Sequence, residues 1–241
     1  MTEIQMTDYP YGISFLNRKT KIQIRKITEG GSKNGFGTGT YNHGVTYEGE
    51  YKDGQPHGKG KLKNYGGYEG KDGTFTGGDT YDGKFKHGLP HGKGTLFHPE
   101  NMSRKGTIYY EGDWVFGEQT GKGKMYWNSG SKMYEGYFVD GEFHGKGTEF
   151  GHDFISFEGD WVKGEYHGKG TQYKPDGSKY YEGEFKKGFR HGKGILYGSD
   201  GETFEGEFKK SEFISPNENT IKHKNNIISM EEVKKRKGLI L

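Results

Sequence analysis

The sequence predicts an all-β protein: an elongated, twisted, single-layer antiparallel sheet built from repeated β-hairpins. The first observation is a unit, Tyr-Glu-Gly-x-aromatic followed by a turn and His-Gly-Lys-Gly, whose near-copies are 23 or 24 residues apart from Tyr110 onward. A constant period in this range is typical of repeat architectures. The second is composition, because 45 of 241 residues are glycine and only 28% are hydrophobic, of which aromatic residues supply more than half. Aliphatic side chains are too few for a thick core, so a thin, aromatic-rich sheet is favoured.

Each unit contains two predicted strands. In the first, Tyr47–Tyr51, alternate side chains point to opposite faces, which puts the aromatic residues and glycine on one face and the glutamates on the other. Turn-forming residues at 52–56 lead into the second strand, His57–Leu62. Two strands with a short link form an antiparallel hairpin, and hairpins in series form a meander. Glycine weakens a strand unless another group must approach closely, so we expect the glycines to make room for rings of the neighbouring strand.

The repeated pattern closely resembles the MORN repeat (membrane occupation and recognition nexus), over Tyr47 to Lys210. The resemblance implies an elongated single-layer sheet with a groove along one face. It also implies a scaffold role, since members of this family occur in ciliary radial spokes, basal structures and membrane junctions. In style the chain is similar to the MORN scaffolds of radial-spoke heads.

The repeat boundaries predict four regions along the chain. We expect an N-terminal extension at 1–20 without the features of a targeting signal, and a divergent cap repeat at 21–46. The MORN array at 47–210 comprises six full units, one shortened unit and a C-terminal half unit. The tail at 211–241 carries a capping-box pattern that predicts a short helix at about 230–237.

The shortened unit lies at residues 68–75, where the period stretches. The favoured interpretation is a degenerate repeat that keeps the sheet continuous. The alternative is a bulge or kink that shapes a partner site.

The motifs that could indicate a metal site or a phosphate-binding loop do not have the required residues or spacing. The chain has no cysteine, and the repeated histidines are two strands apart, about 9.6 Å, too far to share a zinc ion. The Gly-Lys-Gly triplets lack the Ser or Thr of a phosphate-binding loop. We therefore expect no enzyme activity, no cofactor and no metal site.

The lysines of the Gly-Lys-Gly triplets suggest cross-strand charge pairs. We expect them to face the acidic residues at the second position of each unit, in pairs worth about 0.2–1 kcal/mol each. The lysines are Lys59, Lys93, Lys122, Lys146, Lys169 and Lys193, and the acids are Glu48, Asp82, Glu111, Glu135, Glu158 and Glu182.

These features together predict a non-catalytic scaffold that holds a partner polypeptide along an aromatic groove. We expect a protein partner in a multi-subunit ciliary, axonemal or cytoskeletal assembly, a cytoplasmic location and no nucleic acid, since the net charge is only +3. The predicted groove residues are Tyr47, Tyr51, Tyr81, Phe85, Tyr110, Trp114, Tyr134, Phe138, Phe157, Trp161, Tyr181 and Phe185.

The alternative function is a peripheral membrane tether. It would bind anionic phospholipids through the lysine rows and through a basic cluster in the tail. The same cluster also suits contact with an acidic protein partner, and its residues are Lys234, Lys235, Arg236 and Lys237.

Overall fold

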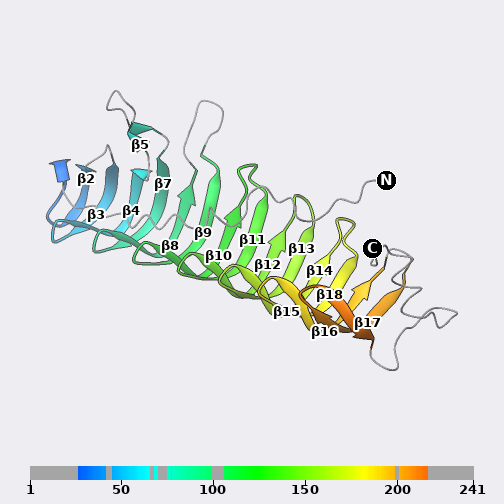
Figure 1. Cartoon of the computed structure of the whole chain (residues 1–241). Coiled ribbons are helices and arrows are strands. Elements are labelled where there is room, and N and C mark those ends of the chain that lie inside the picture. The colour runs from blue at the N-terminus through cyan, green and yellow to red at the C-terminus, as the bar shows by residue number, and fades with distance from the viewer. Residues whose placement is uncertain are drawn as a thin grey trace. The chain divides into compact units, whose positions relative to one another are not determined.

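Every regular element that the structure describes is a β-strand. The computed structural model describes residues 27–41, 45–65, 68–69, 75–76, 78–98, 106–198 and 201–216. Within them, sixteen strands are hydrogen-bonded in chain order as one antiparallel sheet (Figure 1). This confirms the predicted all-β meander. The predicted extension at 1–20 and the helix at about 230–237 lie outside the described residues, and the part that is described contains no helix suited to crossing a membrane.

The chain divides into two compact units, with the division inside β12 after Phe143. The first unit contains the strands up to β11 and the start of β12. Its strands are β1 (Ile27–Gly30), β2 (Gly35–Tyr41), β3 (Thr46–Lys52), β4 (Gln55–Tyr65), β5 (Tyr68–Glu69), β6 (Phe75–Thr76), β7 (Asp79–Lys86), β8 (Leu89–Phe97), β9 (Ile108–Val115), β10 (Glu118–Tyr126), β11 (Lys132–Val139) and β12 (Glu142–Phe150).

The second unit continues the same hairpin pattern from His144. Its remaining strands are β13 (Ile155–Val162), β14 (Glu165–Tyr173), β15 (Lys179–Lys186), β16 (Phe189–Tyr197), β17 (Thr203–Lys209) and β18 (Glu212–Pro216).

Two-residue turns of one type close the hairpins of the repeats. Asp53 and Gly54 have φ angles of 52° and 76°, and both central residues are positive in every one of these turns. This is the type I′ geometry, whose twist matches that of the paired strands and which favours glycine at its second position. The central pairs are Asp53-Gly54, His87-Gly88, Phe116-Gly117, Asp140-Gly141, Lys163-Gly164, Lys187-Gly188 and Lys210-Ser211.

Rings packed on bare glycine backbone form the centre of each hairpin. Gly183 of β15 lies opposite Gly194 of β16, and a Cβ atom built on Gly194 would overlap the ring and hydroxyl of Tyr181. The same arrangement places Tyr47 on Gly60 in the first unit. The expectation that these glycines make room for rings is confirmed, because any side chain here would displace the ring that covers the backbone.

The rings also contact one another edge to face. Tyr110 meets Trp114 with centroids 5.2 Å apart at 90°, and meets Phe138 of the next repeat at 5.0 Å and 85°. Contacts of this geometry contribute about 0.5–1.5 kcal/mol beyond the burial of area. In the second unit, Phe157 packs in the same way on Trp161 and Phe185. The rings therefore join each hairpin to the next within a unit.

The first glycine of each His-Gly-Lys-Gly segment has a different role. Gly58 has a φ of 59° and lies in a bulge, because Gly49 pairs with Gly60 while Tyr51 pairs with Pro56. Glu50 alone thus faces three residues of β4. Its carboxylate covers Gly58 and accepts the Lys59 backbone N–H at 3.1 Å. A backbone position with a positive φ favours glycine, and at Gly58 the covering carboxylate also leaves no room for a Cβ atom.

The two described strands of the shortened unit are not part of the sixteen-stranded sheet. β5 and β6 form a separate two-stranded hairpin, while β4 pairs directly with β7. The sheet is continuous, as predicted, but the prediction that a degenerate repeat at 68–75 maintains the continuity is wrong. The register of Gly60 with Gly83 lets β4 and β7 pair without an intervening strand.

Two glycines of one hairpin are needed for different reasons: Gly194 leaves room for a ring, and Gly188 adopts a positive φ in the turn. Gly194→Ala should destabilise the protein by more than about 3 kcal/mol, because the buried ring of Tyr181 cannot move away. Gly188→Ala should cost only about 1–2 kcal/mol, since the turn residue has a φ of 79° but no atom within 4 Å of the new Cβ. Urea unfolding followed by circular dichroism measures both, and equal losses would contradict the packing of Tyr181 on Gly194.

Candidate functional site

The aromatic residues predicted to hold a partner are in the core. The most exposed of the twelve is Trp114, at 4%, so in the free chain their rings are not available to a ligand. The prediction of an open aromatic groove disagrees with this burial. It arises because rings such as Tyr110 and Tyr181 lie on glycine backbone, and because the rings also cover one another. The twelve buried residues are Tyr47, Tyr51, Tyr81, Phe85, Tyr110, Trp114, Tyr134, Phe138, Phe157, Trp161, Tyr181 and Phe185.

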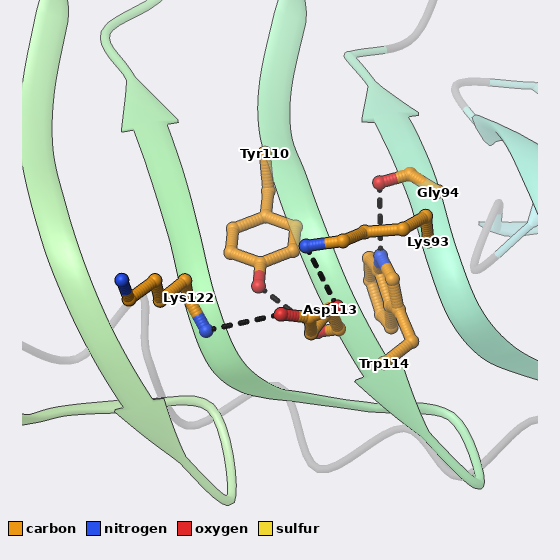
Figure 2. Close-up of polar contacts among 6 residues, drawn as sticks. All are labelled: Lys93, Gly94, Tyr110, Asp113, Trp114 and Lys122. Carbon is orange, nitrogen blue, oxygen red and sulfur yellow. Dashed lines mark hydrogen bonds and ion pairs between the residues drawn. The ribbon is translucent and has the colours of Figure 1, made fainter.

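Polar groups at the ring edges strengthen this core. Tyr110 Oη donates to the carbonyl oxygen of Asp113 at 3.0 Å, and Trp114 Nε1 donates to the carbonyl oxygen of Gly94 in the preceding hairpin at 3.1 Å (Figure 2). Burial raises the pKa of the Tyr110 hydroxyl above its usual range, and raises that of Tyr181 to about 12. These hydroxyls stay protonated as hydrogen-bond donors, which is a structural role.

The opposite face of the sheet, which we call the charged face, contains a groove in the first unit. Its floor is glycine backbone, because paired glycines of β8, β9, β10 and β11 follow one another across the sheet. A Cβ atom on Gly94, Gly112 or Gly123 would point away from this groove, toward the rings on the other face. The groove has a volume of about 630 Å³. We call it the glycine groove, and its lining residues are Lys93, Gly94, Thr95, Glu111, Gly112, Lys122, Gly123, Lys124, Glu135, Gly136 and Tyr137.

Two rows of side chains border the glycine groove. We call the row nearer the type I′ turns the turn-side row and the other the far row. The far row continues onto β7 and β4 by direct pairing of Thr95 with Asp82 and of Asp82 with Lys61. In the turn-side row Lys84 pairs directly with Lys59, but the bulge of β8 prevents its direct pairing with Lys93. The turn-side row is Lys59, Lys84, Lys93, Asp113, Lys122 and Tyr137, and the far row is Lys61, Asp82, Thr95, Glu111, Lys124 and Glu135.

Asp113 shows how an acidic residue is held in the turn-side row. One carboxylate oxygen accepts the backbone N–H of Lys122 at 3.2 Å, which belongs to the bulge of its own hairpin. The other lies 2.8 Å from Lys93 Nζ of the preceding hairpin (Figure 2). Asp160 in the second unit has the same two partners, Lys169 N–H and Lys146 Nζ. The fourth position of the repeat is therefore a carboxylate site with two built-in donors.

This geometry corrects the predicted charge pairs. Lys93 forms its ion pair with Asp113, a fourth-position acid, and not with Asp82 or Glu111 as expected. The reason is register, because Gly94 pairs with Gly112 and therefore places Lys93 opposite Asp113. The predicted second-position acids lie in the far row, where the ion pairs are Lys61–Asp82, Lys124–Glu111 and Lys132–Glu135.

The two rows differ in charge balance. In the far row each acidic residue forms an ion pair with a lysine. The turn-side row, in contrast, carries four lysines and one aspartate. Lys59 faces Lys84, and Lys122 lies 5.4 Å from the ring centroid of Tyr137. In the second unit every corresponding lysine faces an acid: Lys146 faces Asp160, Lys169 faces Glu184 and Lys193 faces Glu207. Excess positive charge is therefore particular to the first unit.

Two other groups of residues stand out in the sequence: the repeated histidines and the basic cluster of the tail. His57 lies with its ring centroid 5.9 Å from that of His87, and over the described ranges no group of three or more His, Cys, Asp or Glu side chains is arranged to hold a metal ion. The basic residues Lys234, Lys235, Arg236 and Lys237 lie outside the described residues.

Comparison with known families gives a match over six segments of the chain. The family model for the MORN repeat matches residues 47–67, 81–101, 110–132, 134–153, 157–179 and 181–203.

The chain belongs to the MORN-repeat family.

Each matched segment begins at a buried aromatic residue in the first strand of a hairpin described above. MORN repeats are scaffold-type repeats associated with protein–protein and membrane contacts, not with catalysis. A comparison with curated proteins finds no match to this MORN chain. The repeats of this chain share the core of rings packed on glycine. The excess of lysine in the turn-side row departs from the pattern of the other repeats.

Glu149 is a second departure, on the ring-bearing face of the second unit opposite Phe157. It occupies the repeat position of Leu62 and Met125, which are buried, and it is largely enclosed. Tyr166 and Ser156 donate hydrogen bonds to its Oε2 at 2.5 and 2.8 Å. Burial raises the pKa of Glu149 above its ordinary value of 4.5, and the two hydrogen bonds only partly oppose this.

This carboxyl should make stability depend on pH. As pH rises above 4.5, Glu149 ionises in the unfolded chain before it does so in the folded one, so the free energy of unfolding falls until the raised pKa is passed. Glu149→Gln keeps a hydrogen-bond acceptor but cannot ionise, and should remove the decline. Urea unfolding between pH 4 and 8 measures it.

Glu158→Gln is the matched control, because Glu158 is exposed on the charged face. Its unfolding profile should follow that of the wild type. If the Glu149→Gln profile also runs parallel to the wild type, the enclosed carboxyl has no effect on stability and the account is wrong.

Proposed function

We propose that the chain is a non-catalytic scaffold that holds a partner polypeptide in the glycine groove of its first unit. The observation that carries this is the groove itself, whose floor is backbone without side chains. A partner can approach such a floor closely and contact carbonyl and charged groups on both sides, as in other grooves that bind extended or helical segments.

Burial of the aromatic face supports this choice of surface. Since the rings stabilise the sheet, a partner that used them would have to open the core. On the charged face, Tyr137 is 43% exposed at the edge of the glycine groove. Tyrosine is enriched among residues that dominate binding energy because it buries a large area while keeping a polar group. Tyr137 is therefore the anchor that a partner would cover.

The assembly we propose is ciliary, axonemal or cytoskeletal, with a cytoplasmic location. The support is the resemblance to MORN scaffolds of radial-spoke type, together with a repeat array that presents one surface over several hairpins. The partner is a protein in a multi-subunit complex. Proximity labelling in cells that build cilia, followed by identification of the neighbours, tests the assembly.

A matched pair of substitutions tests the groove. Thr95→Trp should fill part of the glycine groove, and Thr171→Trp places the same side chain at the equivalent position of the second unit. Both threonines face glutamates on adjacent strands, so the effects on folding should be similar. Proximity labelling should lose the specific neighbours with Thr95→Trp, by about tenfold or more, and retain them with Thr171→Trp.

Two outcomes would contradict the proposal. Neighbours that persist with Thr95→Trp would show that the groove is not the contact. Salt-sensitive flotation of the isolated protein with phosphatidylserine vesicles, unaffected by Thr95→Trp, would instead favour the membrane tether.

A further inference from the structure

Comparison of the repeats with one another identifies one position at which an internal acid is replaced by a base. The fourth position of the repeat is acidic in five of seven copies. Four of the five acids lie opposite a lysine of the preceding hairpin, whereas Glu50 lies opposite Phe36. The second copy has Lys84 and the fourth has Tyr137. The acids are Glu50, Asp113, Asp160, Glu184 and Glu207.

Lys84 therefore faces Lys59 directly across β4 and β7. Both side chains are exposed on the charged face, and neither forms an ion pair within the described residues. Like charges directly opposite each other destabilise a sheet. The alkyl stem of Lys84 lies 3.3 Å from the Cβ position of Gly92, where Glu50 and Asp113 cover Gly58 and Gly121. Lys84 thus occupies the place of the acid but carries the opposite charge.

Within the described residues, the neighbouring carboxylates form no ion pair with either lysine. Asp82, two residues before Lys84 on the same strand, is engaged by Lys61 at 3.1 Å. Glu50 accepts the Lys59 backbone N–H in the preceding hairpin. On the other side, Lys93 is paired with Asp113. No described acid therefore lies between the ammonium groups of Lys59 and Lys84, which are adjacent in the turn-side row to the residues of the glycine groove.

We propose that Lys59 and Lys84 form a binding site for a carboxylate side chain, Asp or Glu, of the partner polypeptide that lies in the glycine groove. This inference rests on the proposed function. The chemistry follows from the equivalent positions, where a carboxylate is received from within the chain. At Lys59 and Lys84, a partner carboxylate accepts hydrogen bonds from two ammonium groups and relieves their repulsion. An exposed pair of this kind selects acidic segments and steers their association more than it adds affinity.

A single substitution tests the site in two independent ways. Lys84→Glu restores the acid of the repeat, opposite Lys59 and over Gly92. It should raise the midpoint of thermal unfolding, because it replaces a repulsive pair by an attractive one. It should also weaken binding of a fluorescein-labelled peptide of alternating Glu and Ala by about tenfold, measured by fluorescence anisotropy at low ionic strength.

The controls separate a specific site from general electrostatic attraction. Lys186→Glu makes the same change of charge at an exposed position of the second unit, and should leave peptide affinity within about twofold of the wild type. A peptide with Gln in place of Glu should bind none of the proteins. The proposal is overturned if the wild type does not bind the acidic peptide, if both variants weaken binding equally, or if Lys84→Glu lowers the unfolding midpoint.

Failure of this inference is distinguishable from failure of the proposed function. If Thr95→Trp removes the cellular neighbours while Lys84→Glu leaves both neighbours and peptide affinity unchanged, the groove binds a partner but Lys59 and Lys84 are not its carboxylate site. Binding to phosphatidylserine vesicles that Lys84→Glu abolishes, without binding of the peptide, would assign the lysine pair to a membrane surface instead.

Discussion

The packing of aromatic rings on glycine backbone is the constraint on which the rest of this structure depends. A ring such as Tyr181 covers two paired glycines, Gly183 and Gly194. That contact fixes the register of the hairpin, since the two glycines must lie opposite each other. Register then decides which charged residues meet on the opposite face, because side chains alternate along each strand. The packing of the core thus determines which charged residues pair on the charged face, although the rings lie on the opposite face.

The same constraint explains why the partner surface is assigned to the charged face. A sheet with few aliphatic residues depends for its stability on its rings, and rings that are fully buried by their neighbours cannot also serve a ligand. The side chains of the charged face contribute much less to the stability of the sheet. Its ion pairs are exposed and contribute about 0–1 kcal/mol each, so its residues can depart from the repeat at little cost. The departures at Lys84 and Tyr137 are of this kind, and both lie in the turn-side row.

Sequence spacing predicted much of this fold for identifiable reasons. Period-2 alternation and turn residues such as Asp53-Gly54 specify the strands and the type I′ turns, and the glycines indicate the ring contacts. The face that remains accessible could not be predicted, because alternation assigns rings to one face without saying how completely they bury one another. The lysine pairing was also missed. It depends on the bulge at Gly58 and on the Gly60–Gly83 register, whereas the sequence suggested simple pairing of Lys59 with Glu48. The unpaired Lys59–Lys84 position could have been found by aligning the fourth positions of the repeats.

The central claim is that the rings are core and that the partner surface is the opposite face of the first unit. Hydroxyl-radical footprinting with mass spectrometry tests it most directly, because it measures the exposure of each side chain in solution. In the free protein, Tyr137 should be oxidised readily while Tyr110 and Tyr134 are protected, and the partner should protect Tyr137. Rapid oxidation of Tyr110 and Tyr134 in the free protein, suppressed by the partner, would contradict the account and restore the aromatic face as the binding surface.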